Sequence, residues 1–188
     1  MIPYLMWYRA MRQKYYMDRI SFTYPMEKDA LYRLVKVQLQ GLIDGVPDLI
    51  ANLANMSALL NQAMPDINWV GFYLMKNGRL VLGPFQGKPA CVEIPAGQGV
   101  CGTAAARDEI MLVENVHEFP GHIACDSASQ SEIVLPIHKD GEIFGVLDID
   151  SPIIARFDEE DRRGLYELVR IFERWLGGGN GRINRISV

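Results

Sequence analysis

The segment FGVLDIDS, from Phe144 to Ser151, constrains the fold more than any other part of the chain. Its hydrophobic and acidic residues alternate with the period of a β-strand, whose successive side chains point to opposite faces of a sheet. Asp148 and Asp150 therefore share one face. Leu147 and Ile149 share the other. Two carboxylates about 7 Å apart on one face repel each other unless a cation or a proton lies between them.

Two explanations of this acidic face are open. It is either the solvated outer face of an antiparallel sheet, whose last Asp caps the turn before Ser151-Pro152, or the floor of a pocket. Such a pocket would hold a small cationic or protonatable ligand. Both explanations require the segment to be a strand.

The segment Asn68–Met75 predicts a second strand, followed by a tight turn. The dipeptide Asn77-Gly78 is typical of a type I′ turn, so Leu80–Phe85 is expected to return as the antiparallel partner. Trp69 and Tyr73 would lie on one face of the first strand with a glycine between them. That gap fits either a ligand or a neighbouring backbone.

A second hairpin is predicted around Asp140-Gly141, which joins the apolar segment 131–138 to 142–150. With the turn centred there, facing positions sum to about 281. Glu132 is therefore expected near both Asp148 and Asp150. Three acids would converge at one end of the sheet.

The remaining elements follow from helical periodicity and turn residues. We expect helices at 27–43, 47–64, 98–107 and 158–177 and short strands at 90–94 and 110–113. The first two helices would each lay one face on the sheet. These elements predict an α+β domain with a central antiparallel sheet of about six strands covered by helices.

Length and composition fit one domain. The 188 residues suit a single core, expected at 27–177, with an extension at 1–26 that is an accessory helix or partly disordered and a flexible tail at 178–188. A net charge of -4 argues against nucleic acid as a partner, because no basic surplus is available to neutralise phosphates. No run of 18 apolar residues exists, so we expect no membrane span.

Three cysteines, Cys91, Cys101 and Cys125, are an odd number, which does not form a disulfide framework and indicates a reducing compartment. Zinc bound by these thiols with His117 or His122 is disfavoured, because structural zinc sites contain closely spaced ligand pairs. We therefore expect no metal. Buried cysteines acting as small hydrophobic residues are the simplest alternative for all three.

Two of the cysteines lie in unusual surroundings. Cys101 is expected in the first turn of the helix at 98–107, where the helix field lowers the pKa of a thiol, although tight packing also explains a small residue there. Cys125 lies in a long irregular loop, 114–128, beside Asp126. Loops of this length in compact domains are usually lids, binding loops or disordered segments.

Several of these segments resemble the free methionine (R)-sulfoxide reductases, which are built on a GAF domain. The resemblance covers roughly residues 27–176 and is carried by Asn68–Tyr73, Leu82–Gly87, Pro89–Cys91, Gly99–Gly102, Cys125-Asp126 and Gly145–Ser151. It implies a GAF-like fold and a cytoplasmic enzyme that reduces free L-methionine (R)-S-oxide without a cofactor. It also implies thioredoxin as the reductant. Dimers are common among GAF domains, which makes a homodimer one option.

Sulfoxide reduction needs a nucleophilic thiolate and a neighbouring acid that keeps its proton. A sulfenic acid forms first and condenses with a second thiol to a disulfide. We expect Cys125 to attack, because it lies on the expected lid with acidic neighbours, and Cys91 to resolve. Cys101 is the alternative nucleophile.

The substrate would be held by the two hairpins. Trp69 and Tyr73 are expected to pack on the methyl and thioether groups. Crowding of Glu132, Asp148 and Asp150 would raise at least one pKa, so that one acid supplies protons while another binds the ammonium group. A GAF domain that senses a small molecule, and a thiol redox switch without turnover, are the alternatives.

Overall fold

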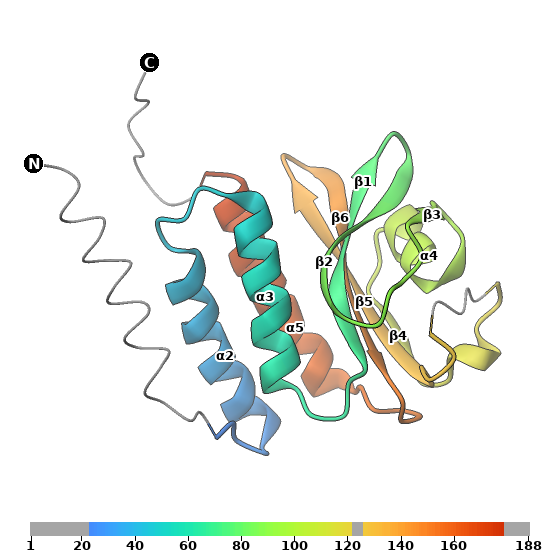
Figure 1. Ribbon diagram of the computed structural model, residues 1–188, viewed down its shortest axis with the longest axis horizontal. Helices are drawn as coiled ribbons and strands as arrows, with labels where there is room; N and C mark the ends of the chain where they lie inside the picture. The colour runs from blue at the N-terminus through green and yellow to red at the C-terminus, as the bar shows by residue number, and fades with distance from the viewer. Residues whose placement is uncertain (1–22, 122–125, 179–188) are drawn as a thin grey trace, which may run out of the picture.

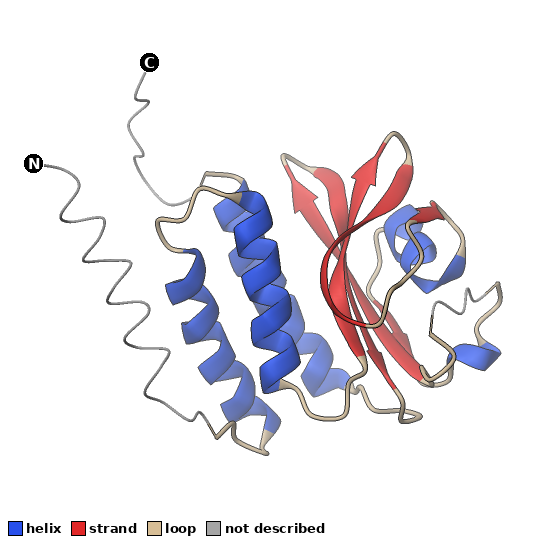
Figure 2. Ribbon diagram, in the orientation of Figure 1, coloured by secondary structure: helices blue, strands red, loops and turns tan. Residues whose placement is uncertain are grey.

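The structure, a computed structural model, describes residues 23–121 and 126–178. Helices α3 (Leu49–Ala63) and α5 (Glu159–Leu176) cover one face of a curled sheet, with α2 (Lys28–Ile43) on their outer side, and the short helix α4 (Gly99–Arg107) lies on the opposite face (Figures 1 and 2). The predictions for residues 1–22, for Cys125 and for the tail beyond 178 lie outside the described residues. Within them, no helix is long and apolar enough to cross a bilayer.

The sheet has six strands in the order β3-β2-β1-β6-β5-β4, and every neighbouring pair is antiparallel. The strands are β1 (Trp69–Lys76), β2 (Arg79–Gly87), β3 (Glu93–Pro95), β4 (Met111–Val113), β5 (Ser131–Lys139) and β6 (Glu142–Ser151). The predicted α+β fold with about six antiparallel strands is confirmed.

The three long helices begin where acidic side chains, those of Glu27, Asp48 and Asp158, cap their first amides. They are α2 (Lys28–Ile43), α3 (Leu49–Ala63), α4 (Gly99–Arg107), the 3-10 turn η1 (Val116–Glu118) and α5 (Glu159–Leu176). Helices α3 and α5 pack on the sheet, whereas α2 packs mainly on α3 and α5. The expectation that α2 lies on the sheet is therefore wrong, because α3 and α5 together already cover that face.

Both predicted hairpins form around left-handed turn residues. Asn77 and Gly78 have φ of 52° and 77°, and Asp140 and Gly141 have φ of 53° and 84°. Two consecutive positive φ values match the type I′ turn, whose twist fits that of the flanking strands.

A bulge sets the register of the second hairpin. Next to the turn, Lys139 faces Glu142, as the predicted sum of 281 requires. An irregularity between Ile137 and His138 then shifts the pairing by one residue, so Glu132 faces Asp150 directly. The predicted convergence of the acids is confirmed, with the register corrected by the bulge.

Strand β3 begins later than predicted. The expected strand at 90–94 is observed at Glu93–Pro95, preceded by one further backbone hydrogen bond to β2, from the N–H of Leu82 to the carbonyl of Val92 at 2.9 Å. The carbonyl of Cys91 accepts a hydrogen bond from the Tyr73 hydroxyl, at 3.0 Å. The sheet partner of β3 is therefore limited to the start of β2.

The sheet separates two hydrophobic cores. Leu147 and Ile149 belong to the larger core under the long helices, and Val146 belongs to the smaller core under α4. Asp148 shares the α4 side with Val146. The alternation of β6 thus assigns its acidic face to the α4 layer.

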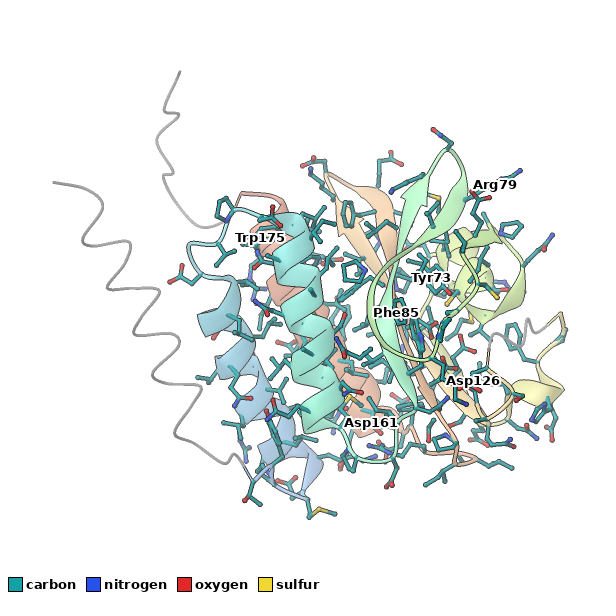
Figure 3. All side chains as sticks on the ribbon, viewed as in Figure 1. Tyr73, Arg79, Phe85, Asp126, Asp161 and Trp175 are labelled. Atoms are coloured by element: carbon teal, nitrogen blue, oxygen red, sulfur yellow. The ribbon has the colours of Figure 1, made fainter. Side chains whose placement is uncertain are left out.

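A buried carboxylate fastens α5 to α2. Asp161, labelled in Figure 3, is 1% exposed and accepts hydrogen bonds from Tyr32 Oη at 2.7 Å, Lys28 Nζ at 2.6 Å and Arg156 Nη1 at 3.3 Å. Its carboxylate also caps the backbone N–H of Asp158 at the start of α5. Removing this side chain would take an acceptor from four donors at once, although Lys28 also donates to Asp158, at 2.7 Å.

We expect Asp161→Ala to lower the free energy of unfolding by about 3 kcal/mol in urea denaturation, because it leaves buried donors unpaired. The matched control is Glu167→Ala on the same helix, which removes an exposed ion pair with Lys36 and should cost less than about 1 kcal/mol. Equal losses for the two variants would contradict this role of Asp161.

Candidate functional site

A cavity lies between α4 and the sheet, with an empty volume of about 530 Å³ that includes its opening to solvent. Tyr73 and Asp126, both labelled in Figure 3, belong to its wall. Its apolar lining is Trp69, Tyr73, Pro89, Ala90, Ile94 and Val100, and its polar lining is Cys101, Asp126, Ser129, Glu132, Asp148 and Asp150. All five predicted substrate-binding residues and Cys101 therefore line one cavity.

The acids form the floor of this cavity. Glu132 and Asp148 are each 6% exposed, and Asp150 is half-buried. Cys101 Sγ lies 3.7 Å from Glu132 Oε1. The alternative of a solvated acidic face is therefore wrong, because α4 and the loops around it cover these carboxyl groups.

Burial is the largest cause of the raised pKa of each acid on the floor. It raises the pKa of Asp148 to about 6. The pKa of Glu132 is raised further by the charges of Asp148 and Asp150, and that of Asp150 by the charge of Asp148. Carboxyl groups that share a desolvated site cannot all ionise, so the cluster retains protons at pH values above the range in which carboxyl groups usually titrate.

The thiol of Cys101 has a raised pKa. Burial is the main cause, followed by the charges of Asp148 and Glu132. Cys101 does lie in the first turn of α4, as predicted, but the predicted lowering of its pKa is wrong. The field of a nine-residue helix is outweighed by desolvation and by two carboxyl groups.

The aromatic wall is built by stacking. Trp69 stacks on Phe85 at 5.3 Å and on Tyr73 at 5.9 Å between ring centroids, and its Nε1 donates to the carbonyl of Lys88 at 3.2 Å. A Cβ on Gly71 would lie 2.3 Å from Phe85 Cβ. The glycine gap therefore admits the neighbouring strand and not a ligand.

The three cysteines differ in state. Cys101 is a free thiol, whereas Cys91, on the half-buried segment before β3, is disulfide-bonded. Cys125 lies outside the described residues. The roles expected of the three thiols stay predictions.

Sequence reasoning missed a polar group at the rim. Asp126 accepts hydrogen bonds from the backbone N–H of Ala128 at 2.9 Å, from Lys88 Nζ at 3.2 Å and from Asn68 Nδ2 at 3.2 Å. The hydrogen bond from the backbone N–H of Ala128 is the main cause that lowers the pKa of Asp126. Asn68 also donates to Ser129, so this group ties the loop after residue 125 to β1. Only the Asx-turn of Asp126 has a local sequence signal.

The chain matches proteins of known family. The GAF domain family matches residues 39–173. The free methionine-R-sulfoxide reductase of Escherichia coli (strain K12) is 53% identical over 151 residues, which cover 80% of this chain and 92% of that protein.

Two solved structures are similar to most of this chain. The free methionine-R-sulfoxide reductase of Neisseria meningitidis, in complex with its substrate, has a TM-score of 0.79 and 46% identity, covering 82% of this chain and 93% of that one. The fRMsr of Staphylococcus aureus, also in complex with substrate, has a TM-score of 0.75 and 55% identity, covering 78% and 95%. This chain belongs to the GAF domain family and, within it, to the free methionine-R-sulfoxide reductases.

Proposed function

We propose that this protein reduces free L-methionine (R)-S-oxide to L-methionine. The observation that carries the proposal is the floor of the cavity, where Glu132 and Asp148 are buried beside the thiol of Cys101. Relatives named free methionine-R-sulfoxide reductases, two of them solved with substrate, support it. The R preference comes from those relatives.

The cavity offers a partner for each group of the substrate. An ammonium group would bind the acidic floor, and a methyl and thioether would pack on Trp69. Helix α4 begins at Gly99 without a side-chain hydrogen bond from its N-cap, Gln98. Gly99, Val100 and Cys101 of its first turn line the cavity, so their amides are suited to the α-carboxylate.

The first chemical step transfers oxygen from substrate to protein. The nucleophilic thiolate, proposed to be that of Cys125, attacks the sulfoxide, and the S=O bond breaks as an S–O bond to cysteine forms. One proton is taken up, so the products are methionine and a cysteine sulfenic acid. Glu132, Asp148 or Asp150 supplies the proton, because each has a raised pKa.

The second step forms a disulfide, and a third step restores the thiols. Cys91 attacks the sulfenic acid, water leaves, and a disulfide remains. An external dithiol, proposed to be thioredoxin, then donates two electrons and two protons. Cys101 is proposed to be neither the nucleophile nor the resolving thiol. The raised pKa of Cys101 and the disulfide-bonded state of Cys91 support this choice.

Consumption of a dithiol fits a reducing compartment, and we propose the cytoplasm. A homodimer, and a catalytic domain at 27–177, remain proposals from the sequence. They do not affect the chemistry above.

Turnover tests the proposed function directly. We expect the reduced protein, supplied with a thioredoxin system, to oxidise NADPH when free methionine (R)-sulfoxide is added, and to leave the S isomer and peptide-bound sulfoxide unreacted. Binding of methionine sulfoxide without NADPH loss would indicate a sensor. Neither binding nor turnover would indicate a thiol redox switch.

Single Cys→Ser variants test the thiol roles in a single-turnover assay for the sulfenic acid. Cys125→Ser should abolish sulfenate formation, whereas Cys91→Ser should allow it and block the disulfide. Loss in Cys101→Ser together with retention in Cys125→Ser would reverse the assignment of the nucleophile.

Asp148→Asn should raise stability relative to wild type at high pH and lower turnover. Folding raises the pKa of Asp148 from 3.8 to about 6, so its contribution to stability is present below pH about 4 and is lost as pH rises through 6. Relative to wild type, the variant should therefore gain about 3 kcal/mol of unfolding free energy between pH about 3 and pH about 8. Turnover should fall about a hundredfold, because a proton donor is removed.

The matched control is Glu142→Gln, an exposed acid on the same strand, which should change neither quantity. Full turnover in Asp148→Asn, with the same stability difference at both pH values, would show that the carboxyl group has no role in proton supply.

A further inference from the structure

Three groups that bind metal ions meet on the floor of the cavity. The sulfur of Cys101 and carboxylate oxygens of Glu132 and Asp148 lie within 4.8 Å of one another. They come from α4, β5 and β6, and all three side chains are buried. Separate elements thus converge on one point.

A second observation points to a ligand there. The carboxyl group of Asp148 shares hydrogen bonds with Cys101 and Glu132, but its buried Oδ1 has no partner among the described residues, although the side chain lines the cavity. A buried carboxylate oxygen without a partner is costly, and a ligand that supplies positive charge or a proton offsets that cost.

The distances suit a thiophilic metal. In a tetrahedral zinc site, Zn–S of about 2.3 Å and Zn–O of about 2.1 Å place sulfur and oxygen about 3.6 Å apart. Cys101 Sγ and Glu132 Oε1 are 3.7 Å apart. An ion could therefore bridge these two atoms with little movement of either.

Charge favours a cation as well. The ion pairs of the described residues include none to Glu132, Asp148 or Asp150, and Lys88, which precedes Pro89 of the cavity lining, pairs with Asp126. The acids are therefore neutralised only by protons, which a divalent cation can replace.

We propose that the reduced protein binds one thiophilic divalent cation, of the Zn²⁺ class, through Cys101 Sγ, Glu132 and Asp148. The thiol of Cys101 releases its proton to solvent as the metal–sulfur bond forms, and no oxidation occurs. The fourth coordination position faces the cavity, where water completes the site. This ligand set differs from one built of three thiols and a histidine, since Cys101 is its sole sulfur.

The site would make the enzyme sensitive to metal. The same acids are the ones assigned to the substrate ammonium and to proton supply, so a bound cation would exclude methionine sulfoxide. This competition rests on the proposed function, whereas metal binding itself does not.

Cobalt(II) is the probe. Reduced protein, separated from reductant and kept anaerobic, should bind one equivalent of Co²⁺ with tetrahedral visible bands and a thiolate-to-metal charge-transfer band, and Zn²⁺ should bleach them. Cys101→Ser should lose the charge-transfer band. The matched control, the double variant Cys91→Ser, Cys125→Ser, should keep it.

Asp148→Asn should weaken Co²⁺ binding by about tenfold or more while far-ultraviolet circular dichroism shows an intact fold. Glu142→Gln should bind as wild type does. The metal site is overturned if no charge-transfer band forms, if Cys101→Ser retains it, or if the double variant loses it.

Free methionine sulfoxide should displace Co²⁺ from the wild-type protein. Formation of the site without displacement would overturn the competition alone. A protein that binds Co²⁺ through Cys101 but shows no turnover would keep the metal site and reject the proposed reductase.

Discussion

The burial of carboxyl groups beside a thiol is the constraint on which the rest of this structure depends. Glu132 and Asp148 are each 6% exposed, yet no described basic side chain pairs with them. An arrangement of this kind costs stability unless protons or a ligand neutralise it. The other side of the sheet offsets the cost, since α2, α3 and α5 bury the larger of the two hydrophobic cores there. The sheet therefore separates the layer of long helices from the short helix that covers the cavity (Figure 2).

Local backbone features position the side chains that line the cavity. The bulge at Ile137 and His138 shifts β5 by one residue and sets Glu132 opposite Asp150. The tight approach of Phe85 to Gly71 holds Trp69 between two rings at the cavity wall. Helix α4 covers the cavity on the side opposite the sheet and contributes the sulfur of Cys101 rather than a positively charged side chain. These features together produce a small, partly apolar cavity with a protonatable floor, which is what a zwitterionic sulfoxide requires.

Much of this could be predicted from the sequence, because its signals are local. The alternation of β6 identified the acidic face, and the two turns fixed which strands pair. The raised pKa of Cys101 could not be predicted, since it arises first from tertiary burial and then from the charges of Asp148 and Glu132, which are distant in the chain. The same holds for the contacts of Asp126 with Lys88 and Asn68, which join residues 38 and 58 positions apart. Helix α2 was misplaced for a similar reason: periodicity indicates that one face is buried but not which element covers it.

The central claim, that the floor of the cavity keeps protons at neutral pH, is tested most directly by a carbon-13 NMR titration of the carboxyl groups in the reduced, ligand-free protein. The structure predicts a pKa of about 6 for Asp148 and values raised above the ordinary range for Glu132 and Asp150. Assignment through Asp148→Asn and Glu132→Gln would separate the three resonances. Ordinary titration of all three groups near pH 4 would contradict the account, because solvated carboxylates behave in that way.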